Sequence, residues 1–182
     1  MSASTLVSGQ AWNKGKLVGH KAPLRLNEIY AIRVHLQIAG RTRDLALFNL
    51  AIDWKLRACV LVIFRVQGIC HGAQVLHRAM VMQRKTQTPV QFEVTEQTRL
   101  SVGRWIQERS LAPTDFLFPS RVVRSSCLTS RQYARIVHQW LRQIELDDSR
   151  YGTHSMRRTK LAFIYRRTRN LRAVQLLLGH SD

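Results

Sequence analysis

The sequence predicts a mainly α fold with a small antiparallel β-sheet, an α+β class in which helices dominate. Apolar residues recur every three or four positions along most of the chain, which is the period of one helix face. Between His77 and Val94 the period changes to two, which is typical of strands. The chain has 182 residues, of which 45% are hydrophobic, and this is enough for the core of one domain.

The first part of the chain divides into an arm and a helix. Residues 1–28 are polar, contain Gly and Lys and show no period. We therefore expect a flexible basic arm there and a folded domain over residues 29–182. A weak helical pattern over Glu28–Ala39 predicts the first helix, and Gly40 can end it in a left-handed conformation.

A second helix and a polar break come next. Thr42 or Asp44 can cap a helix that runs through Ile52. The polar segment around Arg57 interrupts the pattern, and an apolar stretch follows it over residues 60–64. Arg57 therefore stands at the junction of two apolar segments, where its guanidinium can enter a cleft.

The segment with period two predicts a β-hairpin. Lys85 lies in the polar turn between its two arms. From the tip of a hairpin a long cationic side chain can reach a substrate, although such a residue alone is usually a surface charge. The apolar residues that alternate on the two arms are Met80, Met82, Val90, Phe92 and Val94.

Two threonines open the next predicted helices. Thr95 can cap a helix through Ile106, and Thr129 opens the most regular helix of the chain. Pro113 and Pro119 bracket a short loop or strand between them. The helix after Thr129 has an apolar stripe at helical spacing that is expected to face the core: Tyr133, Ile136, Val137, Trp140, Leu141 and Ile144.

The final segment holds a pair of residues suited to binding an anion. We expect Thr153 to cap a helix that carries His154 and Arg157 in its first turn. At a spacing of three these two side chains share a face, and the helix start favours negative charge. Arg157 can hold two phosphate oxygens with its planar fork. An isolated pair of this kind is more often a solvated basic face.

A third cationic side chain follows the last predicted helix. We expect Asn170 to cap that helix and Gly179 to end it, which would turn His180 back towards the neighbouring helix start. On its own, an exposed histidine after a helix end means little. Together with His154 and Arg157, however, His180 could surround one phosphate.

The net charge of the chain indicates the class of its binding partner. The chain has 29 Lys and Arg against 11 Asp and Glu, a net charge of +18, which predicts salt-sensitive binding to polyanions. Such a charge also fits a ribosomal or a membrane-surface protein.

Cys59, Cys70 and Cys127 form no close pair, so we expect reduced thiols in the cytoplasm. No apolar run is long enough to span a membrane.

The ordered series Arg57, Lys85, His154-x-x-Arg157 and Leu-Gly-His180 resembles the tyrosine recombinase (phage integrase) family. The resemblance runs from about residue 24 to the end. Its most specific part is GTHSMRRTKLAFIYRRTRNLRAVQLLLGHS, which is similar to the second conserved box of the family. RDLALFNLAIDWKLRAC is similar to the first box, and QRKTQTPVQFEVTEQTR to the lysine hairpin.

The resemblance implies a role for each residue of the series. Arg57 and Arg157 would hold the nonbridging oxygens of a scissile DNA phosphate, and His154 and His180 would hydrogen-bond it. Lys85 would protonate the leaving 5′ oxygen while a tyrosine attacks and forms a 3′-phosphotyrosyl bond. Such a site needs no metal and no cofactor, because cationic side chains stabilise the charge.

The chain departs from the family at its end. The nucleophilic tyrosine of the family lies beyond Leu-Gly-His, and none of the tyrosines here occupies that place: Tyr30, Tyr133, Tyr151 and Tyr165. We therefore expect a C-terminally truncated catalytic domain without its nucleophile. In addition, Val60 stands where the family usually has an acidic residue, and Gln87 where related hairpins favour Gly.

Two functions from different classes follow from the resemblance. The first is DNA integration or other site-specific recombination by strand cleavage and rejoining, encoded by a mobile element, with this chain inactive in cleavage. The alternative is a non-catalytic DNA-binding remnant of an integrase. A basic RNA-binding structural protein fits the charge but leaves the ordered series unexplained. We expect double-stranded DNA as the partner, self-association on DNA, no membrane, and a bacterial cytoplasmic, nucleoid-associated location.

Overall fold

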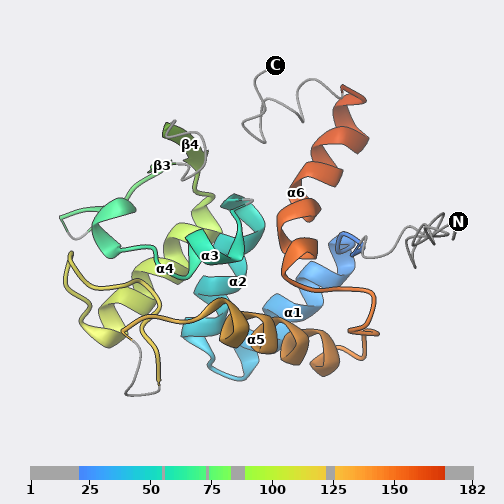
Figure 1. Cartoon of the computed structure of the whole chain (residues 1–182), viewed down its shortest axis with the longest axis horizontal. Coiled ribbons are helices and arrows are strands. Elements are labelled where there is room, and N and C mark those ends of the chain that lie inside the picture. Colours follow the sequence, from blue (N-terminus) through green and yellow to red (C-terminus); the bar gives the residue numbers. More distant parts are fainter. Residues whose placement is uncertain (1–20, 55, 73, 83–88, 122–125, 171–182) are drawn as a thin grey trace, which may run out of the picture.

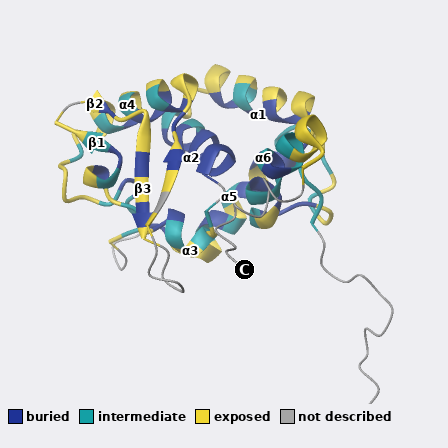
Figure 2. Cartoon of the chain, turned by 90° about the horizontal axis from the view of Figure 1, so that it is seen from above, coloured by how far each residue is buried: buried dark blue, intermediate teal, exposed yellow. Residues whose placement is uncertain are grey.

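The computed structural model describes residues 21–54, 56–72, 74–82, 89–121 and 126–170 (Figure 1). Its centre is helix α2 (Thr42–Trp54), in which 11 of 13 residues are buried. In Figure 2, α2 is dark blue and lies between α1 (Leu26–Ile38) and α5 (Ser130–Gln143). The predicted mainly α class with small antiparallel sheets is confirmed.

The helices on either side of α2 follow from the sequence pattern. α1 buries Ile29, Ile32 and Leu36, and Gly40 follows it with φ of +61°, as predicted for a left-handed helix end. Residues 21–25 also belong to the packed structure, although we predicted that residues 1–28 form an arm, since Leu24 is 2% exposed. The structure of residues 1–20 lies outside the described residues.

Threonine side chains cap the N-termini of two further helices. Thr95 precedes α4 (Glu96–Arg109), and its hydroxyl accepts a hydrogen bond from the Thr98 N–H. Thr129 precedes α5 and forms a capping box with Gln132, in which each side chain accepts from the backbone N–H of the other residue. The predicted stripe of α5 faces the core, with Tyr133, Val137, Trp140 and Leu141 buried.

The predicted hairpin is present. β3 (Arg78–Met82) pairs antiparallel with β4 (Pro89–Glu93). Ala79 and Val81 face inward on β3, whereas Met80 and Met82 are exposed, so the inward residues of this arm are not the two methionines. A second two-stranded sheet, β1 (Cys70–His71) with β2 (Gln74–Val75), was not predicted from the sequence.

Short segments connect these elements. α3 (Ala58–Leu61) follows Arg57 directly, and a 3₁₀ turn (Val66–Gly68) follows α3. Between Pro113 and Pro119, Phe116 makes an isolated antiparallel bridge to Arg65. Ring contacts join these segments to α2, because Trp54 meets Phe64 edge to face with 4.7 Å between centroids.

The last described helix, α6 (Thr153–Thr168), begins differently from the prediction. Its N-cap is Gly152, and Thr153 is its first helical residue. The side-chain cap predicted for Thr153 is therefore wrong: the N–H of Ser155 donates to the Gly152 carbonyl, and the Ser155 hydroxyl accepts a hydrogen bond from the Gly152 N–H at 3.1 Å. The helix predicted after Asn170 lies outside the described residues. No described helix has the length and apolar character needed to cross a bilayer.

Candidate functional site

A cavity of about 260 Å³ lies where α3, α5 and α6 begin. It is smaller than most small-molecule pockets, which occupy about 300–1,000 Å³. Two arginines and a histidine line it, and none of its described lining residues is acidic. The lining residues are Leu56, Arg57, Ala58, Cys59, Ser130, Thr153, His154 and Arg157.

Arg57 is placed by the junction between α2 and α3. Its backbone is extended, with φ of −67° and ψ of 146°, and it is the N-cap of α3. Its carbonyl accepts hydrogen bonds from the N–H groups of Val60 and Leu61. The backbone is therefore held while the side chain remains exposed. The polar segment predicted around Arg57 thus places its guanidinium at the cavity.

His154 and Arg157 are placed by the first turn of α6. Gly152 and Ser155 fix this turn through two hydrogen bonds, one from each backbone N–H. Ser155 is fully buried, whereas Arg157 is half-buried and His154 is exposed. The helix start thus presents both side chains to the cavity, at the spacing of three that the sequence predicted.

The electrostatics of the cavity favour an anion. Burial lowers the pKa of the Arg157 guanidinium, and the positive charges of Arg57 and Arg158 lower this pKa further. The Nε atom of Arg157 is buried and has no hydrogen-bond partner in the described part of the chain. A buried donor without a partner and two like charges in one cavity both destabilise the unliganded protein, and a phosphate group would satisfy both.

A buried carboxylate connects helices α2, α4 and α6. Asp53, near the end of α2, accepts hydrogen bonds from the Thr95 N–H at 3.1 Å and from the hydroxyls of Thr95 and Thr98 at 2.7 and 2.6 Å. Its second oxygen lies 3.7 Å from Nζ of Lys160 on α6. Asp53 stands four residues before Arg57, and Lys160 three residues after Arg157. This network therefore connects α6, which carries Arg157, to the end of α2, which precedes Arg57.

The structure brings together three of the five predicted site residues. Arg57, His154 and Arg157 line the same cavity. Lys85 and His180 lie outside the described residues. Sequence reasoning missed Ser130 and Thr153, which also line the cavity. A serine or threonine at the first position of a helix gives no separate signal in the sequence, because such residues are common at helix starts.

No tyrosine lines the cavity, although all four tyrosines are among the described residues. Tyr133 and Tyr151 are buried, with 2% and 7% of their surface exposed. Burial raises the pKa of both hydroxyls, and Glu28 raises that of Tyr151 further. Tyr30 on α1 and Tyr165 on α6 are exposed, away from the residues that line the cavity.

Comparisons with known proteins identify the family and the fold of the chain. A family model described as the phage integrase family matches residues 23–182. The XerA recombinase structure is similar with a TM-score of 0.72 at 16% identity, over 88% of this chain and 57% of that one. The XerH site-specific recombinase bound to difH substrate is similar with a TM-score of 0.69 at 18% identity, over 88% and 48%.

A transposon protein has the same fold. The Tn1549 transposon integrase in complex with circular intermediate DNA gives a TM-score of 0.67 at 16% identity, over 90% of this chain and 59% of that one. At such identities the likeness shows the fold. The chain spans about half the length of these solved structures. The search of curated proteins gave no match.

Proposed function

Since this chain belongs to the phage integrase family, the tyrosine recombinases, we propose that its cavity binds the scissile phosphate of duplex DNA during site-specific recombination. One observation carries the proposal. Arg57 and Arg157 come from segments 100 residues apart in the sequence and converge in one cavity, whose described lining includes no acidic residue. The unpartnered Nε of Arg157 is available to a phosphate oxygen.

The roles proposed for Arg57, Arg157 and His154 rest on their places in the cavity, and those proposed for Lys85 and His180 rest on the family resemblance alone. Arg57 and Arg157 hold the two nonbridging oxygens and stabilise the charge of the pentacoordinate transition state. His154 hydrogen-bonds the same phosphate from the helix start. We assign the proton transfer to the leaving 5′ oxygen to Lys85, and a further hydrogen bond to His180.

The nucleophile is the missing part of the proposal. In the covalent step, a tyrosine oxygen bonds to phosphorus while the bond from phosphorus to the 5′ oxygen breaks and that oxygen gains a proton. None of the four tyrosines of this chain lines the cavity. We therefore propose that residues 1–182 bind and orient the phosphate without supplying the attacking group. The alternative, a non-catalytic DNA-binding remnant, also lacks the attacking group, but in addition it has no working phosphate site.

The cellular location and the DNA partner are inferred from the family and from the net charge. The Tn1549 match is a transposon integrase, and we infer a mobile-element recombinase that acts on DNA in the bacterial cytoplasm, at the nucleoid. We further infer that it self-associates on paired sites. The net charge of +18 supports duplex DNA as the partner, because each neutralised phosphate releases counterions.

Vanadate, a phosphate analogue, provides the first test of the cavity. We expect Arg157→Ala to weaken vanadate binding by about 30- to 150-fold, the loss of a bidentate contact worth about 2–3 kcal/mol. Arg158→Ala is the matched control, because the Arg158 guanidinium donates to the Lys21 carbonyl at 3.1 Å and does not line the cavity. Equal losses in the two variants would contradict the assignment.

A nicked DNA substrate that traps covalent intermediates tests the missing nucleophile. The 182-residue chain should bind the duplex in a salt-sensitive way and give no covalent protein–DNA band on a denaturing gel. A binding slope near zero in log K against log salt would refute DNA as the partner. A covalent band would overturn the statement about the nucleophile, and Tyr165→Phe would then show whether Tyr165 supplies it.

A further inference from the structure

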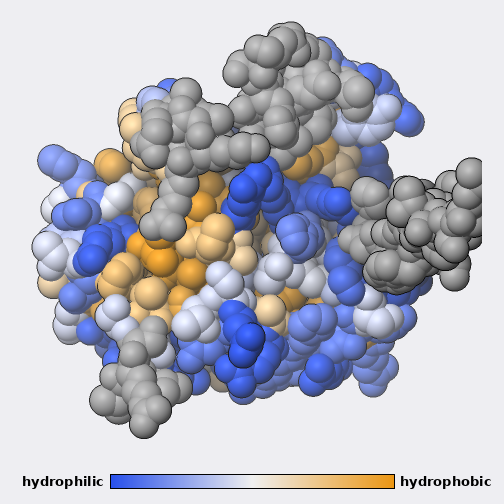
Figure 3. Space-filling view, in the orientation of Figure 1, coloured by the Kyte–Doolittle hydropathy of each residue, from blue (hydrophilic) through white to orange (hydrophobic). Residues whose placement is uncertain are grey.

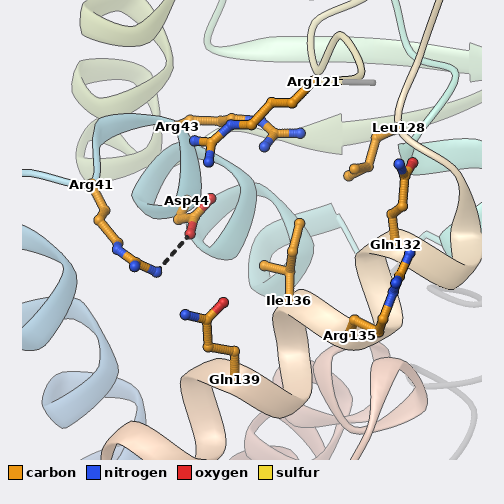
Figure 4. Close-up of a pocket in the computed structure, with 9 residues that line it drawn as sticks. All are labelled: Arg41, Arg43, Asp44, Arg121, Leu128, Gln132, Arg135, Ile136 and Gln139. Carbon is orange, nitrogen blue, oxygen red and sulfur yellow. Dashed lines mark ion pairs between the residues drawn. The ribbon is translucent and has the colours of Figure 1, made fainter. Parts of the chain in front are cut away.

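A second, larger pocket lies between the start of α2 and the middle of α5, with a volume of about 430 Å³ (Figure 4). Four of its nine lining residues are arginines: Arg41, Arg43, Arg121 and Arg135. Asp44 is the one acidic residue among those that line it. Asp44 pairs with Arg41 at 3.6 Å, and its charge also acts on Arg43. Arg121 and Arg135 form no ion pair with a carboxylate among the described residues of the lining.

Arg43 is the buried part of this pocket. It is 6% exposed, and its Nη2 donates to the Pro119 carbonyl at 3.3 Å. Its Nε is buried, and no described residue forms a hydrogen bond with it. Burial lowers the pKa of this guanidinium, and the nearby charge of Arg121 lowers the pKa further. Figure 4 shows the side chains of Arg43 and Arg121 next to each other on one wall. Two adjacent guanidiniums with an unsatisfied donor are suited to sharing one anion.

The rest of the lining adds neutral polar and apolar contacts. Gln132 and Gln139 contribute side-chain amides from α5, and Leu128 and Ile136 form an apolar wall. In Figure 4, Ile136 and Gln139 rise from α5 towards Asp44. The volume falls within the range of about 300–1,000 Å³ that is usual for small-molecule pockets. The pocket therefore has room for more than a single phosphate group.

This pocket is separate from the cavity of Arg57 and Arg157. Ser130 of α5 lines that cavity, whereas Gln139 lines the arginine pocket. Nine residues apart, they lie about 180° from each other around the helix. In Figure 1 the turn between α1 and α2 is at the lower side of the molecule, while the hairpin and α6 extend from the upper side. The two sites share no lining residue.

We propose that the arginine pocket binds a small ligand that carries two or more phosphate groups. Arg43 and Arg121 hold one phosphate on the inner wall, and Arg135 meets a second phosphate at the rim. The glutamine amides and the apolar wall provide a surface for the remainder of such a ligand, as a nucleoside diphosphate would present. Pyrophosphate contains the recognised chemistry alone, so it is the first probe. The inference does not depend on the function proposed for the other cavity.

The test is calorimetric titration of the folded chain with pyrophosphate in about 0.3 M NaCl, where weak diffuse attraction is screened. We expect a saturable pyrophosphate site that is retained in Arg157→Ala, separate from any binding in the cavity of Arg57 and Arg157. Arg121→Ala and Arg135→Ala should each weaken it by about tenfold or more. Arg121 and Arg135 are both exposed, so their replacement should leave the fold intact, whereas a change at buried Arg43 could prevent folding.

Arg131→Ala is the matched control. Arg131 is also an exposed arginine on α5, one turn before Arg135, and it lines neither site. Binding should change by less than about twofold in this variant and in Arg157→Ala. An equal loss in Arg131→Ala would mean that the high charge binds anions diffusely, and a loss confined to Arg157→Ala would move the anion to the other cavity. Either outcome overturns the proposal.

Further ligands identify the source of the phosphates. ADP binding more tightly than pyrophosphate would support a nucleotide, and equal affinities would support recognition of the diphosphate alone. Adenosine binding as well as ADP would overturn the proposal, because the phosphates would then contribute nothing. If pyrophosphate does not bind while Arg121→Ala and Arg135→Ala weaken duplex DNA binding, the pocket is part of the DNA surface and the proposal fails.

Discussion

Replacing Asp53 with asparagine should destabilise the fold more than any comparable change of a surface carboxylate. The asparagine side chain has the same shape, so no cavity forms and the effect isolates the charge. Asp53 is 5% exposed and accepts three hydrogen bonds from Thr95 and Thr98. It also pairs with Lys160 at 3.7 Å. The substitution leaves Lys160 without its carboxylate and converts charge-assisted hydrogen bonds into neutral ones.

The magnitude follows from these contacts. Hydrogen bonds to a charged group contribute about 1.5–3 kcal/mol, against about 1 kcal/mol for neutral ones. Asparagine keeps one acceptor oxygen, so the loss over three bonds is about 2–4 kcal/mol. This is a large part of the total stability of a domain, which is about 5–15 kcal/mol.

Urea unfolding followed by tryptophan fluorescence measures the change in the free energy of unfolding. Asp115→Asn is the control, because Asp115 also accepts a backbone N–H, from Ala112 at 2.8 Å, but is exposed. We expect the control to lose less than about 1 kcal/mol. A loss in Asp53→Asn that is no larger than in the control would refute the reasoning. Because Asp53 links α2 to α6, vanadate binding should also weaken several-fold, whereas Asp115→Asn should leave it unchanged.

Three further substitutions test the helices around the two sites. Burial raises the pKa of the Tyr133 hydroxyl above its ordinary value of 10.0, so the folded protein has its full stability from the neutral hydroxyl below that pH. Above that pH the free energy of unfolding falls by up to about 1.4 kcal/mol per pH unit. Urea unfolding above about pH 10 should therefore show a smaller fall in this free energy per pH unit for Tyr133→Phe than for Tyr30→Phe. Arg157→Met should raise the stability of the unliganded protein by about 0.5 kcal/mol after solvent screening, measured by urea unfolding without phosphate; a decrease would contradict the repulsion between Arg57 and Arg157. Thr129→Ala should cost about 1 kcal/mol by removing the capping box of α5, and an unchanged urea midpoint would show that the cap does not contribute.

The sequence predicted the elements whose signals are local. The stripe of α5 and the alternation around Phe92 depend on spacings within one segment, and the structure has a helix and a strand there. The caps at Thr95 and Thr129 depend on contacts over three residues. The strand pair of β1 and β2 was missed because each strand has two residues, too few for an alternation to appear.

The site was predicted only in part, for a physical reason. The spacing of His154 and Arg157 on one helix can be read from the sequence, and the family resemblance added Arg57. By contrast, Asp53 acts through contacts with residues 42 to 107 positions away in the chain. Such a residue looks like any polar residue near a helix end until the fold places its partners around it. The same holds for Arg43, which in the sequence is one basic residue at a helix start.

The like charges of the cavity explain why the network around Asp53 is needed. Arg57 and Arg157 repel each other, and the buried Nε of Arg157 lacks a partner among the described residues, so the unliganded site opposes the approach of the two segments that carry these arginines. Lys160 is one turn after Arg157, and its contact with Asp53 holds α6 against α2. The Asp53 carboxylate thereby offsets part of the repulsion without entering the cavity, where it would compete with a phosphate for the arginines. A carboxylate moved into the cavity would stabilise the empty protein and abolish anion binding. Its position, buried beside the cavity but absent from its lining, is therefore the one that serves both stability and binding.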